Sequence, residues 1–419
     1  MKVLVLGGGV VGVTSAYFLA KEGHEVVVID QHDQVGQEAT AVNAGLIAPG
    51  HCFAWASPSA PKMLVKSLFG EKTSIRVKLT TDPRFYWWGL QFLRECTSTR
   101  ARANTLAKLT LAEYSQRKLN EVAATESIDY DQVSKGLLYL YRDASELELG
   151  LMKMELLTTN GVKLNRLDAE QLAQVEPAFA NSEVELAGAI HAPDDASGNS
   201  ELFSRELRER CERMGVEFRF GITAQKFTEH GGRITGLVTD QGTLTADQYV
   251  LALGVGSPFL SRSVGQDIPV YPAKGFSVTV RIADKSKAPE LGGVDEKTLV
   301  AWSPMGDYMR MSSTAMFSGY DRSWQASDFD NITETANRLW PGALDWNTAK
   351  LTAGLRPMTP DGPPVIGKGS KHSNLYYNTG HGHMGWTMSC GSSALLADIM
   401  AGRSPEIDAS AFAVRAYRK

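Results

Sequence analysis

A glycine pattern near the N-terminus, Gly7-x-Gly9-x-x-Gly12, constrains the fold of this chain more than any other feature. It lies between residues 2–6, a short apolar run rich in β-branched side chains, and residues 10–21, where apolar side chains recur at helical spacing. In such a strand–turn–helix unit, the first glycine permits a tight turn and the second lets a pyrophosphate approach the backbone. The third lets the helix pack closely on the strand. The pattern predicts a dinucleotide site at the start of a parallel sheet.

A second apolar strand, residues 25–30, follows this helix and ends on Asp30. An acid at this place accepts hydrogen bonds from the ribose of a bound dinucleotide, while the helix N-terminus stabilises its phosphates. We therefore expect the first turn and the end of the second strand to bind the cofactor, through Gly7, Gly9, Val10, Val11, Gly12, Asp30 and Gln31. The motif by itself leaves NAD and FAD open.

Two later glycine-rich segments point to the same site. Residues 248–253 read as a buried strand that runs into Gly254, which predicts a later strand of the same sheet with its glycine close to the cofactor. Three glycines within residues 380–385 open the last predicted helix, and so many glycines are costly unless the backbone needs the freedom. The alternatives are a core strand and turn for the first segment and a flexible loop for the second. His381 and His383 lack a third ligand at a suitable spacing, so we expect no metal.

Arg356 is the residue most suited to binding an acidic substrate. It stands in the sequence Gly-Leu-Arg-Pro, residues 354–357. A planar guanidinium binds a carboxylate through two parallel hydrogen bonds, which a lysine does not reproduce. A surface arginine before a turn is the alternative that composition favours.

Composition limits the class of protein. At roughly 100–200 residues per domain, 419 residues suggest two or three domains, and 43% hydrophobic residues supply a core. The formal net charge of −4, without a basic block, gives no electrostatic case for nucleic acid. Four widely spaced cysteines indicate reduced thiols in a cytoplasmic protein. No run reaches the ~20 apolar residues of a spanning helix, so we expect a soluble protein or one resting on a membrane surface.

Five segments together resemble the D-amino acid oxidase-like flavoproteins, and within them the small subunits of bacterial D-amino acid dehydrogenases. The segments are VLGGGVVGVTSAYFLAKEGHEVVVID, NAGLIAPG, PVYPAKGFSVTV, GLRPMTPDGPPVIG and NTGHGHMGWTMSCGS. The first is general to the superfamily, and the last two are far more specific. The resemblance runs from Lys2 to the C-terminus.

The resemblance implies FAD as the cofactor and gives Arg356 the role of binding the substrate carboxylate. It also implies that one loop lies against the isoalloxazine ring and that another faces the pyrimidine end of the flavin. The first loop comprises Asn43, Ala44, Gly45 and Leu46, and the second comprises Gly382, His383, Met384, Gly385, Trp386 and Thr387.

One family feature is missing. Related oxidases carry a tyrosine near the carboxylate on a substrate-domain strand, where this chain has Ala301 or Trp302. The second contact to the carboxylate or amine is therefore open among three candidates, His51, Tyr271 and Tyr308.

These observations predict an α/β chain, α+β overall, with two domains interleaved in sequence. A Rossmann-like FAD-binding domain is expected from residues 1–50, 196–265 and 351–402, followed by a C-terminal tail, 403–419. A substrate domain with a mixed or antiparallel sheet is expected from residues 51–195 and 266–350. Within it, residues 270–282 and 299–312 alternate like antiparallel strands.

The resemblance implies oxidative deamination of a D-amino acid to a 2-oxo acid and ammonia, with hydride transfer to flavin N5. It further implies electron transfer to a quinone or another non-oxygen acceptor, at the inner face of the cytoplasmic membrane. Three alternatives stay open. They are a glycine- or sarcosine-type oxidase that forms hydrogen peroxide, a flavin-bearing subunit inactive without partners, and an NAD-dependent dehydrogenase.

Overall fold

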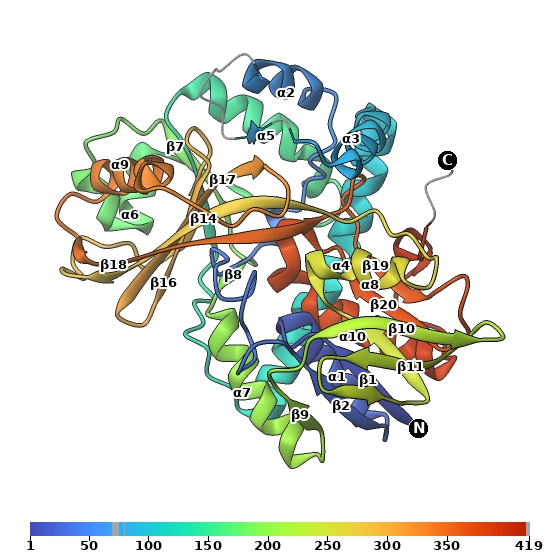
Figure 1. The fold of residues 1–419 in the computed structure, drawn as a ribbon. Helices are drawn as coiled ribbons and strands as arrows, with labels where there is room; N and C mark the ends of the chain where they lie inside the picture. Colours follow the sequence, from blue (N-terminus) through green and yellow to red (C-terminus); the bar gives the residue numbers. More distant parts are fainter. Residues whose placement is uncertain (69–74, 79, 416–419) are drawn as a thin grey trace.

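The computed structural model of the protein describes residues 1–68, 75–78 and 80–415. Two large sheets lie one above the other in Figure 1, with the long strands β14 and β18 crossing over the helices of the lower part. The chain passes between the two parts several times, which agrees with the interleaved organisation expected from the sequence.

The lower sheet contains the predicted parallel strands. Its order is β19-β20-β13-β1-β2-β9, parallel except at the β19 edge. The strands are β1 (Lys2–Leu6), β2 (Glu25–Ile29), β9 (Glu217–Arg219), β13 (Gln248–Leu251), β19 (Val365–Lys368) and β20 (Leu375–Thr379). The predicted strands 2–6, 25–30 and 248–253 are therefore confirmed as neighbours in one sheet.

Both faces of this sheet are covered, which explains why its strands are apolar throughout. On β1, Val3 and Val5 face one core and Leu4 and Leu6 face the other. The first core includes helices α1 (Val10–Lys21), α4 (Ser98–Glu126), α7 (Ser200–Arg213) and α10 (Gly385–Ala401). The second includes the small sheet of β10 (Ala224–His230), β11 (Arg233–Thr239) and β12 (Gly242–Leu244).

The upper sheet is mixed and mostly antiparallel, in the order β18-β14-β17-β16-β15-β5-β7-β6. Its strands are β5 (Leu137–Tyr141), β6 (Asn165–Asp168), β7 (Gly188–Ala192), β14 (Tyr271–Ile282), β15 (Gly292–Asp295), β16 (Val300–Met305), β17 (Tyr308–Phe317) and β18 (Leu344–Met358), with β4 (Ile75–Val77) paired to β17. Residues 270–282 and 299–312 lie in this antiparallel part of the sheet, as expected. The alternation over 299–312 did not reveal that the chain turns back at Gly306, which has φ +61°, and forms the antiparallel pair β16 and β17.

Shorter elements complete the fold. They are β3 (Leu46–Ile47) paired to β8 (Ala196–Ser197), and helices α2 (Ala60–Leu68), α3 (Pro83–Glu95), α5 (Ala144–Thr158), α6 (Ala169–Val175), α8 (Ser257–Arg262) and α9 (Asp330–Leu339).

Two of the predicted domain boundaries fall within continuous parts of the fold. The boundary at residue 351 falls inside β18, a strand of the upper sheet. The predicted tail begins at residue 403, but Phe412 is buried in the core of the lower part and Arg415 pairs with Asp361 at 2.6 Å. Residues 416–419 of the tail lie outside the described residues.

Candidate active site

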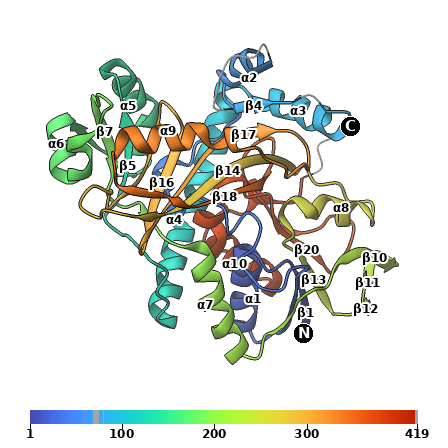
Figure 2. The same cartoon turned by 60° about the vertical axis from the view of Figure 1, so that its left-hand side comes forward.

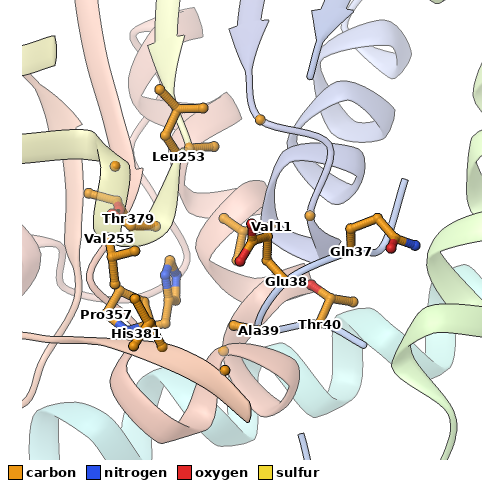
Figure 3. Close-up of a pocket in the computed structure, with 18 of the residues that line it drawn as sticks. Val11, Gln37, Glu38, Ala39, Thr40, Leu253, Val255, Pro357, Thr379 and His381 are labelled. Atoms are coloured by element: carbon orange, nitrogen blue, oxygen red, sulfur yellow. Dashed lines mark hydrogen bonds between the residues drawn. The ribbon is translucent and has the colours of Figure 1, made fainter. Parts of the chain in front are cut away.

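A cavity of about 430 Å³ lies between the two sheets. Its walls come from segments far apart in the sequence, and Figure 3 shows Val11, Glu38 and Thr40 on one side facing Leu253 and His381 on the other. The lining extends from the end of β2 to β18. The cavity is therefore long enough to join the predicted dinucleotide site to Arg356.

Two glycines of the first turn leave no room for a Cβ atom, and the third faces the cavity. Gly7 has φ +112°, and a Cβ atom there would lie 2.6 Å from the carbonyl oxygen of Ala252. A Cβ atom on Gly12 would lie 1.8 Å from the carbonyl oxygen of Gly7, which is impossible without moving the turn. Gly9 lines the cavity at the start of α1, whereas Gly12 does not line it and serves the packing of helix on strand.

Asp30 lies at the cavity wall with its carboxylate held by backbone amides. Oδ2 accepts a hydrogen bond from the amide of Gly8 at 2.6 Å, and Oδ1 accepts one from His32 at 2.8 Å. Each carboxylate oxygen keeps a lone pair for a further donor, such as a ribose hydroxyl. Thr40, which sequence reasoning missed, lines the same end and accepts a hydrogen bond from Val10 at 3.0 Å.

Arg356 reaches the other end of the cavity from β18. Its residue pair on β14 is Ala273, and its guanidinium lies over Gly275, where a Cβ atom would be 2.3 Å from Nη1. Nη2 donates to Oγ of Ser312 at 3.2 Å, and this hydroxyl donates to the carbonyl of Phe276 at 3.0 Å. Burial lowers the pKa of Arg356 to about 10, so the group stays charged at neutral pH. Gly275 and Ser312 were not found from the sequence, since their role depends on strand register.

The glycine-rich segment 380–385 brings two histidines to the cavity. Burial lowers the pKa of His381 to about 3. Burial lowers the pKa of His383 well below its usual value, and the charges of Lys108 and Arg356 lower it further. Both imidazoles are therefore neutral. The ring of His383 stacks on Trp55 with centroids 4.9 Å apart.

The predicted cofactor residues, including those already described, divide into two groups. Those that line the cavity are Gly7, Gly9, Val10, Val11, Asp30, Gln31, Asn43, Gly254, Gly382, His383, Gly385 and Trp386. Those that do not line it are Gly12, Ala44, Gly45, Leu46, Met384 and Thr387. Gly45 instead packs against β16, since a Cβ atom there would lie 2.4 Å from Oγ of Ser303. The hydroxyl of Thr387 accepts a hydrogen bond from Ala48 at 3.2 Å.

His51 and Tyr271, two candidates for a second substrate contact, lie outside the described lining of the cavity. His51 Nε2 lies 2.8 Å from Oε1 of Glu296, and the hydroxyl of Tyr271 donates to Asp82 at 3.3 Å. Each of these two side chains therefore has a carboxylate of the protein as its partner.

Tyr308, the third candidate, is far from Arg356. It pairs with Arg281 on β14, eight residues from the partner of Arg356, which is roughly 26 Å along the strand. Its side chain is 47% exposed. Trp302, one of the two residues expected at the place of the family tyrosine, is buried and donates to the carbonyl of Leu291 at 3.0 Å. Tyr320, which the sequence did not single out, does line the cavity.

Comparisons with known proteins agree with a flavin site. Residues 2–399 match the family model DAO, FAD dependent oxidoreductase. The chain belongs to this family. It is an FAD-dependent oxidoreductase, and the glycine-rich first turn, the oriented acid at Asp30 and the length of the cavity fit that cofactor.

Relatives within the family are similar over their whole length. The chain is 44% identical to "D-amino acid dehydrogenase 2" of Mesorhizobium japonicum over 409 residues, covering 97% of this chain and 98% of that protein. It is 42% identical to a D-amino acid dehydrogenase of Allorhizobium ampelinum, covering 100% and 99%. Among solved structures, glycine oxidases from Bacillus cereus and Geobacillus kaustophilus both superpose with a TM-score of 0.76, at 21% and 22% identity, and each covers 100% of this chain and 99% of that one. The likeness to these oxidases confirms the fold.

Two further properties bear on function. Within the described residues, no helix combines the length and apolarity that crossing a bilayer requires. The same residues contain no group of three or more histidine, cysteine, aspartate or glutamate side chains placed to hold a metal ion.

Proposed function

We propose that the protein oxidises D-amino acids to 2-oxo acids and ammonia. The observation that carries this proposal is the half-buried guanidinium of Arg356 in the FAD cavity of a chain that is 40–44% identical to D-amino acid dehydrogenases. Bound FAD would accept the hydride from the Cα atom at N5. The ammonium group of the substrate would first lose a proton to water, and departure of the hydride would then turn the Cα–N bond into an iminium. Water would hydrolyse this iminium to the 2-oxo acid and ammonia.

Arg356 would bind the carboxylate and fix the direction of the Cα–H bond. Orientation of this kind is worth about 7–11 kcal/mol in favourable systems. Gly275 leaves space for the guanidinium and Ser312 anchors it. The neutral imidazoles of His381 and His383 do not repel the incoming ammonium group. We assign no protein base, because a neutral amine can expel the hydride by itself.

We propose a quinone or another non-oxygen molecule as the electron acceptor, with the protein in the cytoplasm and in peripheral contact with the membrane. α3 exposes a stripe of large apolar side chains at helical spacing, Tyr86, Leu90 and Leu93. Residues 60–103 contain nine lysines and arginines against three acids, in a chain with a net charge of −4. An apolar stripe in a basic segment suits an anionic lipid surface.

The same helix lies beside the cavity. Arg84, in its first turn, lies over the rings of Phe259 and Tyr320, at 5.0 and 5.1 Å from their centroids. Both rings line the cavity. Figure 2 shows α2 and α3 together along one edge of the molecule, and the contact between Arg84 and Phe259 joins α3 to α8. A membrane-dissolved acceptor would therefore enter near this edge.

Two measurements test the proposal. Purified holoenzyme is supplied with a panel of D-amino acids, glycine and sarcosine, with either a dye or oxygen as acceptor. We expect turnover of D-amino acids with the dye and little peroxide with oxygen. Rapid peroxide formation from glycine or sarcosine would favour an oxidase instead. Inactivity of the purified holoenzyme with every amine in the presence of the dye would favour a flavin-bearing subunit that needs partners.

A further inference from the structure

Lys108 is a buried cation that the proposed reaction does not use. It lies on α4, and its residue exposure is 2%. Its Nζ donates one hydrogen bond, to the carbonyl oxygen of Phe53 at 2.8 Å. An ammonium group has three donors. Within residues 1–68, 75–78 and 80–415, Lys108 forms no ion pair.

Lys108 lies directly behind the loop that faces the cavity. It borders a space of about 10 Å³, enough for a single water at most. His381, Gly382 and His383 line this space and also line the main cavity. One loop thickness therefore separates the ammonium group from the cavity. Charge acts strongly across such a wall, because the wall excludes solvent.

The groups around Lys108 offer it no compensating anion. His383 is neutral, and Arg356 is a second cation. Burial raises the pKa of the nearby Cys52 thiol to about 12, so this thiol is neutral as well. A buried charge without a counter-ion is costly. A neutral donor such as glutamine would hold the Phe53 carbonyl equally well, so the hydrogen bond alone does not require a lysine.

We propose that Lys108 raises the electron affinity of bound FAD by stabilising negative charge across the 381–383 loop. A flavin that takes up two electrons and one proton gains one unit of negative charge. The proposal rests on the FAD cavity and on the flavin end lying at this loop. It does not rest on which amine is oxidised. Burial lowers the pKa of Lys108 to about 8, so its ammonium group is still mostly charged at pH 7. Lys108 acts here through this charge, across the loop.

Sulfite binding and the midpoint potential of bound FAD test this without any amine substrate. Sulfite donates an electron pair to flavin N5, forms an S–N5 bond and leaves a negative charge on the ring. In Lys108→Met we expect about tenfold weaker sulfite binding, the size given by unit charges ~10 Å apart at an effective dielectric constant of ~20. The midpoint potential should fall in parallel. Lys108→Gln should behave like Lys108→Met although it keeps a donor for Phe53.

Two variants serve as controls. Lys108→Arg keeps the charge, and Arg102→Met removes an exposed charge from the same helix. Both should bind sulfite within twofold of the parent protein. Unchanged sulfite affinity and potential in the two neutral variants would overturn the proposal. Loss of FAD from both neutral variants would also overturn it, because Lys108 would then support the loop itself. Failure of D-amino acids as substrates would leave these expected results unchanged.

Discussion

The two ends of the cavity are built on different principles. At the dinucleotide end, Gly7, Gly12 and Asp30 lie within one strand–helix–strand unit and act through backbone space and backbone hydrogen bonds. At the amino-acid end, Arg356 and Ser312 come from strands that meet only in the folded sheet. The dinucleotide end depends on glycines that lack a side chain, and the amino-acid end depends on where the side chain of Arg356 is placed.

Their electrostatics differ in the same way. Asp30 brings a carboxylate to the wall at the dinucleotide end, where Glu38 is already paired with Arg322 and His32. Arg356, which is half-buried, and Lys108, which is buried, bring cations to the other end, around neutral imidazoles. The carboxylate of Asp30 suits ribose hydroxyls, and the cations suit a carboxylate and a reduced flavin. Substitutions at the two ends should therefore separate cofactor binding from substrate oxidation.

The largest effect is expected for Gly12→Ala. The added Cβ atom would lie 1.8 Å from the carbonyl oxygen of Gly7, so the turn must move and the protein should lose both FAD and most of its folded yield. Flavin content and thermal unfolding measure this. Gly89→Ala on α3 is the matched control, because a Cβ atom there meets nothing within 4 Å and alanine favours a helix. A stable Gly12→Ala protein that keeps its FAD would show that the turn accommodates a Cβ atom at this position.

Arg356→Ala should separate the two ends most clearly. Loss of a buried charge contact of this kind typically costs 2–5 kcal/mol, so kcat/KM for D-amino acids should fall by about 10²–10³ or more, while FAD stays bound. In Arg356→Lys, kcat/KM should fall less, because the lysine keeps the charge although it loses the planar fork. Amines without a carboxylate should be unaffected. Steady-state kinetics across both substrate classes provide the measurement, and an equal loss for both would argue against carboxylate binding.

Gly275→Ala should reproduce part of this effect without touching the arginine. Its Cβ atom would lie 2.3 Å from Nη1 of Arg356 and displace the guanidinium. We expect kcat/KM to fall by about tenfold or more with FAD retained, because misplacement by ~1 Å is enough to lose rate. Kinetics comparable to the parent protein would show that the guanidinium adapts freely.

Asp30→Ala should act at the opposite end. Hydrogen bonds to charged groups are worth about 1.5–3 kcal/mol, so the Kd for FAD should rise by about tenfold or more. The reduction rate of the flavin that remains bound should change little. Asp33→Ala removes an exposed acid nearby and should leave the Kd unchanged. If the two variants bind FAD equally well in a reconstitution titration, Asp30 does not hold the ribose.

The smallest effect concerns pH and Asp195. This carboxyl group accepts hydrogen bonds from Tyr139 at 2.7 Å and Gly50 at 2.9 Å, and burial raises its pKa to about 7. The unfolded value is about 3.9, so the folded state gains stability from protonation that is lost as pH rises from about 4 to about 7. Asp195→Asn should flatten that part of the profile of melting temperature against pH. If the pH profile of the melting temperature is unchanged in Asp195→Asn, groups other than Asp195 cause the loss of stability.

The first turn was predictable because its signals are local. Glycine spacing, helical periodicity and the acid of the second strand all lie within residues 2–30, and the fold places them as expected. The reversal at Gly306 was missed, because alternation continues through a tight turn between two strands.

The amino-acid end was predictable only in part. Arg356 was singled out by its residue type and by a resemblance, but its supports Gly275 and Ser312 were not, since no sequence pattern gives strand register across β14, β17 and β18. His51 and Tyr271 were chosen by residue type, and their partners Glu296 and Asp82 are 245 and 189 residues away in sequence.

We propose that Arg356 holds the carboxylate of a D-amino acid against bound FAD. Anaerobic mixing of holoenzyme with D- and L-enantiomers of one amino acid, followed through the visible absorbance of the flavin, tests it most directly. We predict rapid bleaching by the D-enantiomer, much slower bleaching by the L-enantiomer, and loss of the rapid phase in Arg356→Ala. Equal rates for both enantiomers, or a rapid phase that persists in Arg356→Ala, would contradict the claim.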